Sequence, residues 1–128
     1  MASQEKEVGD HRRSLGTRGE QYAADFFVER GYQILDRNWR CREGEIDLVI
    51  RRGEELRFVE VKTRASERAG FPEESVTQEK LEHLEAVMAS YLASTSQEVE
   101  VHLDVLAILI APNGAFTVDY LEDVDAAV

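Results

Sequence analysis

Three charged residues interrupt two otherwise apolar segments in the stretch GEIDLVIRRGEELRFVEVKTR, which runs from Gly44 to Arg64. They are Asp47 in the first segment, and Glu60 and Lys62 in the second. Close carboxylates raise one another's pKa unless a cation joins them, and a divalent metal ion that prefers oxygen ligands is such a cation. The metal lowers the pKa of a bound water, while a nearby lysine can orient the nucleophile or offset developing charge. These residue types therefore suit metal-assisted phosphodiester hydrolysis.

Whether these side chains meet depends on the turn between the two segments, because both read as β-strands joined at RRGE. A two-residue loop at Arg52-Gly53 sets Asp47 opposite Phe58, and one at Gly53-Glu54 sets it opposite Glu60. Both registers place Asp47 on the face of Glu60, whereas a three-residue loop would turn it to the other face. Strand patterning alone favours a simpler interpretation, a cross-strand salt bridge on a solvated face.

Apolar periodicity places these strands in a larger α/β domain. It predicts a helix from about Thr17 to Arg30, ended by Gly31, and a second helix from about Thr77 to Ala93. Apolar and β-branched runs predict five strands, YQILDRNWR, EIDLVI, ELRFVEVKT, VEVHLDVLAILIA and AFTVDYL. The order α-β-β-β-α-β-β indicates a mixed sheet of about five strands with helices on one face or on both.

The 128 residues are enough for one domain. We expect residues 1–14 to be disordered, residues 15–122 to form a single domain, and residues 123–128 to be an acidic tail. The segment RASERAGFPEES predicts a loop beside the end of the third strand. Cys41 is the sole cysteine, and no apolar run reaches the roughly 20 residues of a membrane helix. With no signal-peptide pattern, these features favour a cytoplasmic protein without a membrane partner.

Charge is distributed unevenly along the chain, whose net charge is −11. Residues 1–70 hold 14 basic and 14 acidic side chains, whereas residues 71–128 hold 12 acids and one base, Lys80. The basic side chains of the first half surround the opening stretch and are mostly arginines, which make forked contacts with phosphate. The sequence therefore predicts a local basic surface beside an acidic remainder, with ordinary solvated charge as the alternative.

The remaining polar candidates carry less information. His11, His83 and His102 show no metal-ligand spacing among them. His102 and Asp104 share a strand face near the predicted sheet centre, and structural roles are the favoured interpretation for both.

The arrangement of Asp47, then Glu60-Val61-Lys62 on the next strand, with Glu20 in an N-terminal helix, resembles the PD-(D/E)xK nuclease superfamily. Within it, the chain resembles the branch of Holliday-junction resolvases and RecB-type nucleases, and most closely the YraN-like family of bacterial proteins. The matching segments are GTRGEQYAADFF, GYQILDRNWRCREGEIDLVI, FVEVKTR, VTQEKLEHLEAVMASYL and LDVLAI. The resemblance implies a restriction-endonuclease-like three-layer core. Ile46 replaces the proline that leads the superfamily motif.

Carried onto matching positions, the resemblance implies a Mg²⁺ or Mn²⁺ site with Asp47, Glu60 and the main-chain carbonyl of Val61 as ligands. It implies that Lys62 is the catalytic lysine and that Glu20 reaches the same site. An acid that simply suits the first turn of a helix is an equal interpretation of Glu20.

Three further residues are implied as substrate contacts, namely Arg64, Gln78 and Lys80. Gln78 and Lys80 open the second helix, where related nucleases often place a polar residue at the site. A solvated helix start is the favoured alternative for these two.

Two functions are therefore expected. The first is a divalent-metal-dependent endonuclease that hydrolyses DNA, with branched or damaged DNA among its substrates. The second is a non-catalytic module that binds nucleic acid or protein and retains the nuclease fold, and the net charge of −11 favours it. Because enzymes that cut branched DNA are commonly dimers, the resemblance also implies a homodimer.

Overall fold

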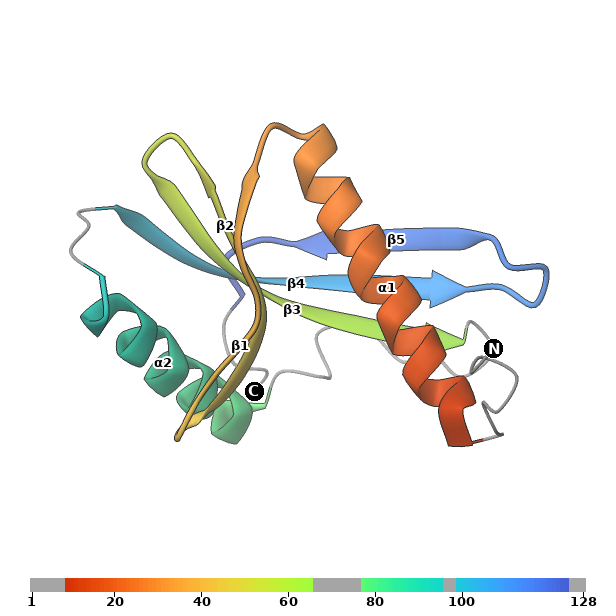
Figure 1. The fold of residues 1–128 in the computed structure, drawn as a ribbon, viewed down its shortest axis with the longest axis horizontal. Helices are drawn as coiled ribbons and strands as arrows, with labels where there is room; N and C mark the ends of the chain where they lie inside the picture. The colour runs from red at the N-terminus through yellow and green to blue at the C-terminus, as the bar shows by residue number, and fades with distance from the viewer. Residues whose placement is uncertain (1–8, 66–76, 96–98, 125–128) are drawn as a thin grey trace, which may run out of the picture.

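The computed structural model describes residues 9–65, 77–95 and 99–124. Seven elements follow one another along the chain (Figure 1): α1 (Gly9–Glu29), β1 (Gln33–Cys41), β2 (Gly44–Arg52), β3 (Glu55–Ala65), α2 (Gln78–Ala93), β4 (Glu100–Ile110) and β5 (Phe116–Leu121). This order confirms the predicted α-β-β-β-α-β-β arrangement.

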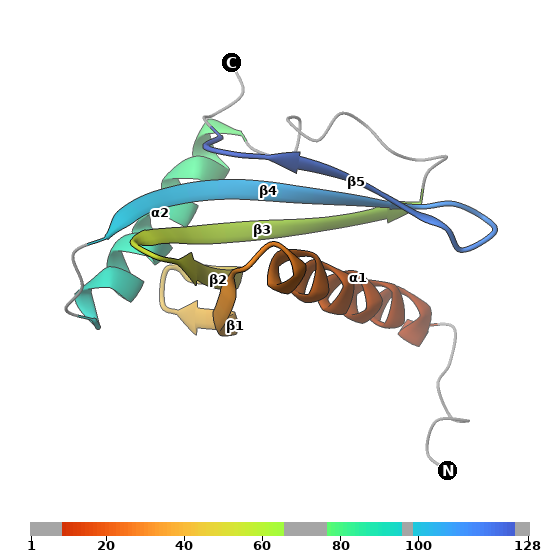
Figure 2. The same cartoon turned by 90° about the horizontal axis from the view of Figure 1, so that it is seen from above.

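The five strands form one sheet in the order β1-β2-β3-β4-β5. Neighbouring strands are antiparallel except β3 and β4, which are parallel and are joined through α2. Figure 2 shows α1 and α2 on opposite faces of this sheet. The protein is therefore a mixed α/β fold with three layers, and the two helices lie on different faces.

Each helix packs on its own apolar cluster. The cluster beneath α1 includes Ala23 and Phe27 together with Leu48, Val59, Leu106 and Ile108 from the strands. The cluster beneath α2 includes Leu84, Val87 and Tyr91 together with Val49, Phe58 and Leu103. Because strand side chains alternate between faces, the central strands supply both clusters at once. This explains why β3 and β4 are apolar over much of their length.

Helix α1 begins at Gly9, earlier than the predicted start near Thr17. It therefore includes residues 9–14, which we expected to be disordered. It ends where predicted, because Gly31 has a φ of 88° and the amides of Gly31 and Tyr32 donate to the carbonyls of Val28 and Phe27. The early residues GDHRRS have no apolar repeat that would mark a helix in the sequence.

Other predictions fall partly outside the described residues. Residues 1–8, most of the RASERAGFPEES loop and residues 125–128 lie there. Of the predicted acidic tail, Asp123 and Val124 are described, and both are tied to β4. Asp123 donates its amide to the Asp104 carboxylate, and Val124 donates to the Leu103 carbonyl.

The β2–β3 turn decides the position of Asp47. Arg52 pairs with Glu55, which leaves Gly53-Glu54 as a two-residue loop, and Gly53 has a φ of 62°. Away from the turn, the pairing of β2 with β3 extends to Leu48 opposite Val59. Continuing the same register by one residue sets Asp47 opposite Glu60. This is one of the two registers expected from the sequence, and it places both acids on the α2 face of the sheet.

Candidate functional site

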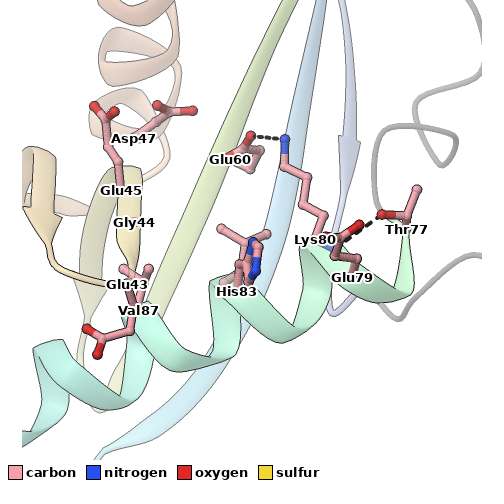
Figure 3. A pocket seen from close by; sticks show the side chains of 11 residues that line it. Glu43, Gly44, Glu45, Asp47, Glu60, Thr77, Glu79, Lys80, His83 and Val87 are labelled. Atoms are coloured by element: carbon pink, nitrogen blue, oxygen red, sulfur yellow. Dashed lines mark hydrogen bonds and ion pairs between the residues drawn. The ribbon is translucent and has the colours of Figure 1, made fainter.

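A pocket of about 440 Å³ lies between the β2–β3 hairpin and the first turns of α2 (Figure 3). Asp47 of β2 and Glu60 of β3 face it from the sheet, and Lys80 reaches it from the helix. The full lining is Glu43, Gly44, Glu45, Asp47, Glu60, Thr77, Glu79, Lys80, His83, Leu84 and Val87. Five carboxylates thus surround one lysine, so the pocket is strongly acidic.

Asp47 is held by the backbone of the neighbouring strand. Its Oδ2 accepts a hydrogen bond of 2.7 Å from the amide of Val61. Burial, followed by the negative charge of Glu60, raises the pKa of Asp47 from 3.8 to about 7, although the Val61 hydrogen bond opposes this. No basic side chain in the described ranges lies within ion-pair distance of Asp47. The simple salt-bridge interpretation therefore fails for this carboxylate.

Glu60 has a different electrostatic environment from Asp47, because two lysine side chains lie beside its carboxylate. Its side chain is buried, and Oε2 lies 2.8 Å from the Nζ of Lys80 and 3.6 Å from the Nζ of Lys62. Burial and the adjacent Lys80 lower the pKa of Lys62. Burial also opposes the charge of Lys80, but the hydrogen bond to Glu60 raises the pKa of Lys80 overall. Lys80 is therefore the cation that accompanies Glu60, while Lys62 releases a proton more readily.

The start of α2 explains how Lys80 arrives at this position. Thr77 is the N-cap, and its hydroxyl accepts a 3.2 Å hydrogen bond from the amide of Lys80. This contact fixes the first turn over the sheet and directs the Lys80 side chain toward Glu60 (Figure 3).

The other predicted site residues are placed less centrally. Glu20 is half-buried on α1, and its charge contributes to the raised pKa of Asp47, so it lies near the site without lining the pocket. The side-chain amide of Gln78 donates to the carboxylate of Glu82 along the helix at 3.2 Å. Arg64 is exposed and acts on Lys62 only through its charge. The structure thus gathers the acids and both lysines, and leaves Gln78 and Arg64 outside the pocket.

Sequence reasoning missed His83 and Glu79 as pocket residues. His83 lies three positions after Lys80 on α2, and residues at that spacing share a helix face. This spacing was the one signal in the sequence that could have placed His83 beside Lys80. It shows that both residues face the pocket only once the position of α2 over the β2–β3 hairpin is known.

The donor set fits a divalent cation that prefers oxygen. Asp47 and Glu60 offer carboxylate oxygens from adjacent strands, and the acidic lining has more negative charge than Lys80 can offset. In the described part of the chain, no third carboxylate joins these two at the close spacing of a complete ligand cluster. An ion here would therefore take further ligands from backbone, water or substrate, as Mg²⁺ commonly does.

Fold and site together define a small α/β protein whose mixed sheet carries an acidic pocket, with Lys80 in its lining and Lys62 beside Glu60. The model of Uncharacterised protein family UPF0102 matches residues 19–108, and the chain belongs to this family.

Several relatives support the family assignment over most of the chain. A UPF0102 protein of Beutenbergia cavernae is 44% identical over 112 residues, which cover 87% of this chain and 95% of the relative. One of Syntrophomonas wolfei is 46% identical over 99 residues, covering 77% and 86%. One of Phocaeicola vulgatus is 36% identical over 109 residues, covering 85% and 89%. This agrees with the resemblance to the YraN-like family.

No helix in the described ranges is both long enough and apolar enough to cross a membrane.

Proposed function

We propose that this protein is a divalent-metal-dependent endonuclease that hydrolyses DNA phosphodiester bonds. The observation that carries the proposal is the pairing of Asp47 and Glu60 on adjacent strands in one acidic pocket, with Lys62 beside them. A purely structural role would not require the buried Glu60, the half-buried Asp47 and a lysine on the same sheet face, because each costs desolvation energy.

Asp47 and Glu60 would hold Mg²⁺ or Mn²⁺, together with the main-chain carbonyl of Val61. Such an ion lowers the pKa of water and stabilises negative charge on phosphate. The Val61 amide already orients the Asp47 carboxylate at 2.7 Å. The protein's own contribution is therefore a pair of pre-positioned oxygen ligands on rigid strands.

The two lysines divide the remaining tasks. Lys80 positions Glu60 through its 2.8 Å contact. Lys62, whose pKa is lowered by burial and by Lys80, gives up a proton from Nζ more readily than an ordinary lysine and so suits proton transfer. Glu20, close enough to raise the pKa of Asp47, is suited to a ligand role through water.

The substrate contacts belong to the arginine-rich first half of the chain. Arg40 and Arg42 are exposed on β1 and the turn that follows it, and Arg42 directly precedes the pocket residues Glu43 and Gly44. Phosphate contacts from such a strip would guide DNA toward an otherwise acidic pocket. We place the protein in the bacterial cytoplasm and propose that it acts as a homodimer on branched DNA, where two strands are cut.

Two observations favour a second function. The Lys80 ammonium forms an ion pair with the Glu60 carboxylate, so it competes with a metal ion for this ligand. With a net charge of −11, the protein would also repel DNA at long range. A module that binds a nucleic acid or protein partner without turnover would retain the same fold.

The first experiment follows Mn²⁺ binding by NMR broadening, because failed cleavage can reflect the wrong substrate. Broadening around Asp47, Glu60 and Lys62 at sub-millimolar Mn²⁺ is expected, and it should disappear in Asp47→Asn and Glu60→Gln. Glu85→Gln, an exposed substitution on α2 outside the pocket, is the matched control and should broaden like the wild type.

Cleavage of linear, damaged and branched DNA is then compared with Mg²⁺, with Mn²⁺ and with EDTA. Metal-dependent products from wild type and Glu85→Gln, absent with Glu60→Gln, support the nuclease. Localised broadening without any cleavage across this panel favours the non-catalytic module, and no localised broadening argues against a metal site in the pocket.

A further inference from the structure

A second group of metal-ligating side chains lies on the opposite face of β3 from Glu60. Glu55 opens β3 and pairs with Glu100, which opens the parallel strand β4 (Figure 1). His102 follows Glu100 by two residues, so both point to one face of the sheet. One ligand atom from each of the three residues lies within 4.8 Å of the others. Strand register, rather than loop conformation, therefore holds this group together.

One ring nitrogen of His102 has a hydrogen-bond partner, and the other ring nitrogen has none. Nδ1 lies 2.5 Å from the carboxylate of Asp123. Because an ionised carboxylate only accepts hydrogen bonds, Nδ1 must carry a proton. In the neutral ring Nε2 then has a lone pair, and it is buried without a hydrogen-bond partner. A carboxylate bound to the far nitrogen of an imidazole is the usual support of a metal-binding histidine.

The unpartnered nitrogen, Nε2 of His102, faces negatively charged side chains. Nε2 lies 3.9 Å from Oε1 of Glu100, and Glu55 completes the group. A lone pair beside two carboxylates is repulsive unless a proton or a cation lies between them. A bound cation would satisfy the orphaned nitrogen and both carboxylates together.

The charged side chains around this group have a net negative charge that a divalent cation would offset. Arg57 contacts Glu55, Asp104 and Glu122, and Arg52 contacts Glu55. Two guanidinium groups thus accompany five carboxylates, those of Glu55, Glu100, Asp104, Glu122 and Asp123. Glu55 already accepts from both arginines, but a carboxylate has further lone pairs for a metal.

We infer that Glu55, Glu100 and His102 form a binding site for a first-row divalent transition-metal ion, with Zn²⁺ as the preferred ion. An imidazole with two carboxylates suits Zn²⁺, which takes three protein ligands and a water, better than it suits Mg²⁺. The ion would join the starts of β3 and β4 and, through Asp123, the segment that follows β5. This site is separate from the pocket of Asp47 and does not depend on nuclease activity.

The test is a calorimetric Zn²⁺ titration of the full chain that carries Asp47→Asn and Glu60→Gln, so that the other pocket contributes no binding. We expect one Zn²⁺ per chain with micromolar affinity or tighter. Glu100→Gln, a substitution of a mostly exposed side chain, and His102→Gln should each weaken binding at least tenfold. Glu122→Gln is the matched control, because it removes a nearby charge that contacts Arg57 without removing a ligand.

Nitrogen NMR of the His102 ring distinguishes the metal from a proton. A Zn²⁺-dependent shift of Nε2 with Nδ1 still protonated supports the site. Doubly protonated His102 at neutral pH throughout the titration would overturn it, because the carboxylates would then be neutralised by the imidazolium. Zn²⁺ binding that Glu100→Gln and His102→Gln leave unchanged would also overturn it.

Discussion

At the scale of single residues, the two acids of the pocket are in different electrostatic states. Glu60 is neutralised by Lys80 at 2.8 Å, whereas Asp47 accepts only a backbone amide and has its pKa raised to about 7 by burial and by Glu60. In the metal-free protein, an ionised Asp47 is therefore an uncompensated charge. A bound cation would remove that penalty, which makes Asp47 the more sensitive reporter of metal binding.

We expect Asp47→Asn to stabilise the metal-free protein at high pH. Asp47 ionises near 3.8 when unfolded and near 7 when folded, so its contribution to folding is lost as the pH rises through that interval. Asparagine keeps an acceptor for the Val61 amide but never ionises. Urea unfolding in EDTA should show a gain on the order of a few kcal/mol at pH 8 and almost none at pH 4. Equal stabilities at pH 8 would contradict this, and Asp119→Asn on the exposed face of β5 is the control.

Lys80→Met should tighten Mn²⁺ binding. The Lys80 ammonium lies where it competes with a metal for Oε2 of Glu60, and methionine keeps the apolar stem while removing the charge. We expect an increase in affinity of about tenfold, which corresponds to about 1.4 kcal/mol, because an ammonium at contact distance repels a bound cation. Titration by NMR broadening measures it. Affinity that is unchanged or weaker would show that Lys80 does not compete for the ion.

At the scale of elements, close packing of α1 on β3 brings Glu20 toward the site. Gly19 is buried against Thr63, and a methyl group at position 19 would collide with the Thr63 hydroxyl. The missing side chain thus allows the helix backbone to approach the strand that carries Glu60 and Lys62. A glycine inside a helix normally weakens it, so its presence here has a packing cause.

Gly19→Ala should therefore destabilise the protein although alanine is the better helix former. Overpacking at this contact is expected to cost about 1–3 kcal/mol in chemical denaturation. Gly16→Ala is the matched control, because nothing lies within 4 Å of the added methyl on the same helix. It should be neutral or stabilising by up to about 1 kcal/mol. Equal effects at the two positions would mean that helix and strand do not pack this closely.

At the scale of the whole molecule, charge separation decides how DNA could approach. The net charge of −11 comes from the second half of the chain, and the first half is neutral with many arginines. Arg40 and Arg42 lie beside the pocket on β1 and its following turn, where Arg40 also contacts Glu45 at 3.5 Å. Phosphate binding should therefore be local and strongly dependent on salt.

If DNA follows this surface, the double variant Arg40→Gln and Arg42→Gln should weaken binding for every sequence tested. The slope of log affinity against log salt should fall in magnitude by about two, because each phosphate contact contributes close to one. Fluorescence anisotropy between 50 and 200 mM salt, with Ca²⁺ to prevent cleavage, measures both. Arg30→Gln at the end of α1, where the guanidinium stacks on Phe26, is the control and should leave the slope unchanged.

The sequence by itself determined the features that depend on local periodicity. Alternation along two strands puts Asp47 and Glu60 on one face for either two-residue loop, and the structure has the loop at Gly53-Glu54. Helical spacing located α2 to within one residue of its observed start, and Gly31 located the end of α1. These signals act over a few residues, so they survive without knowledge of the rest of the fold.

Only the tertiary structure decided which distant residues meet. It set α1 and α2 on opposite faces, joined Lys80 to Glu60, and tied Asp104 and His102 to Arg57 and Asp123. It also brought Glu55 beside His102, although the histidines show no ligand spacing in the sequence. The parallel β3–β4 pairing and the docking of α2 produce these contacts. Such pairings join residues far apart in the chain, and no local pattern encodes their register.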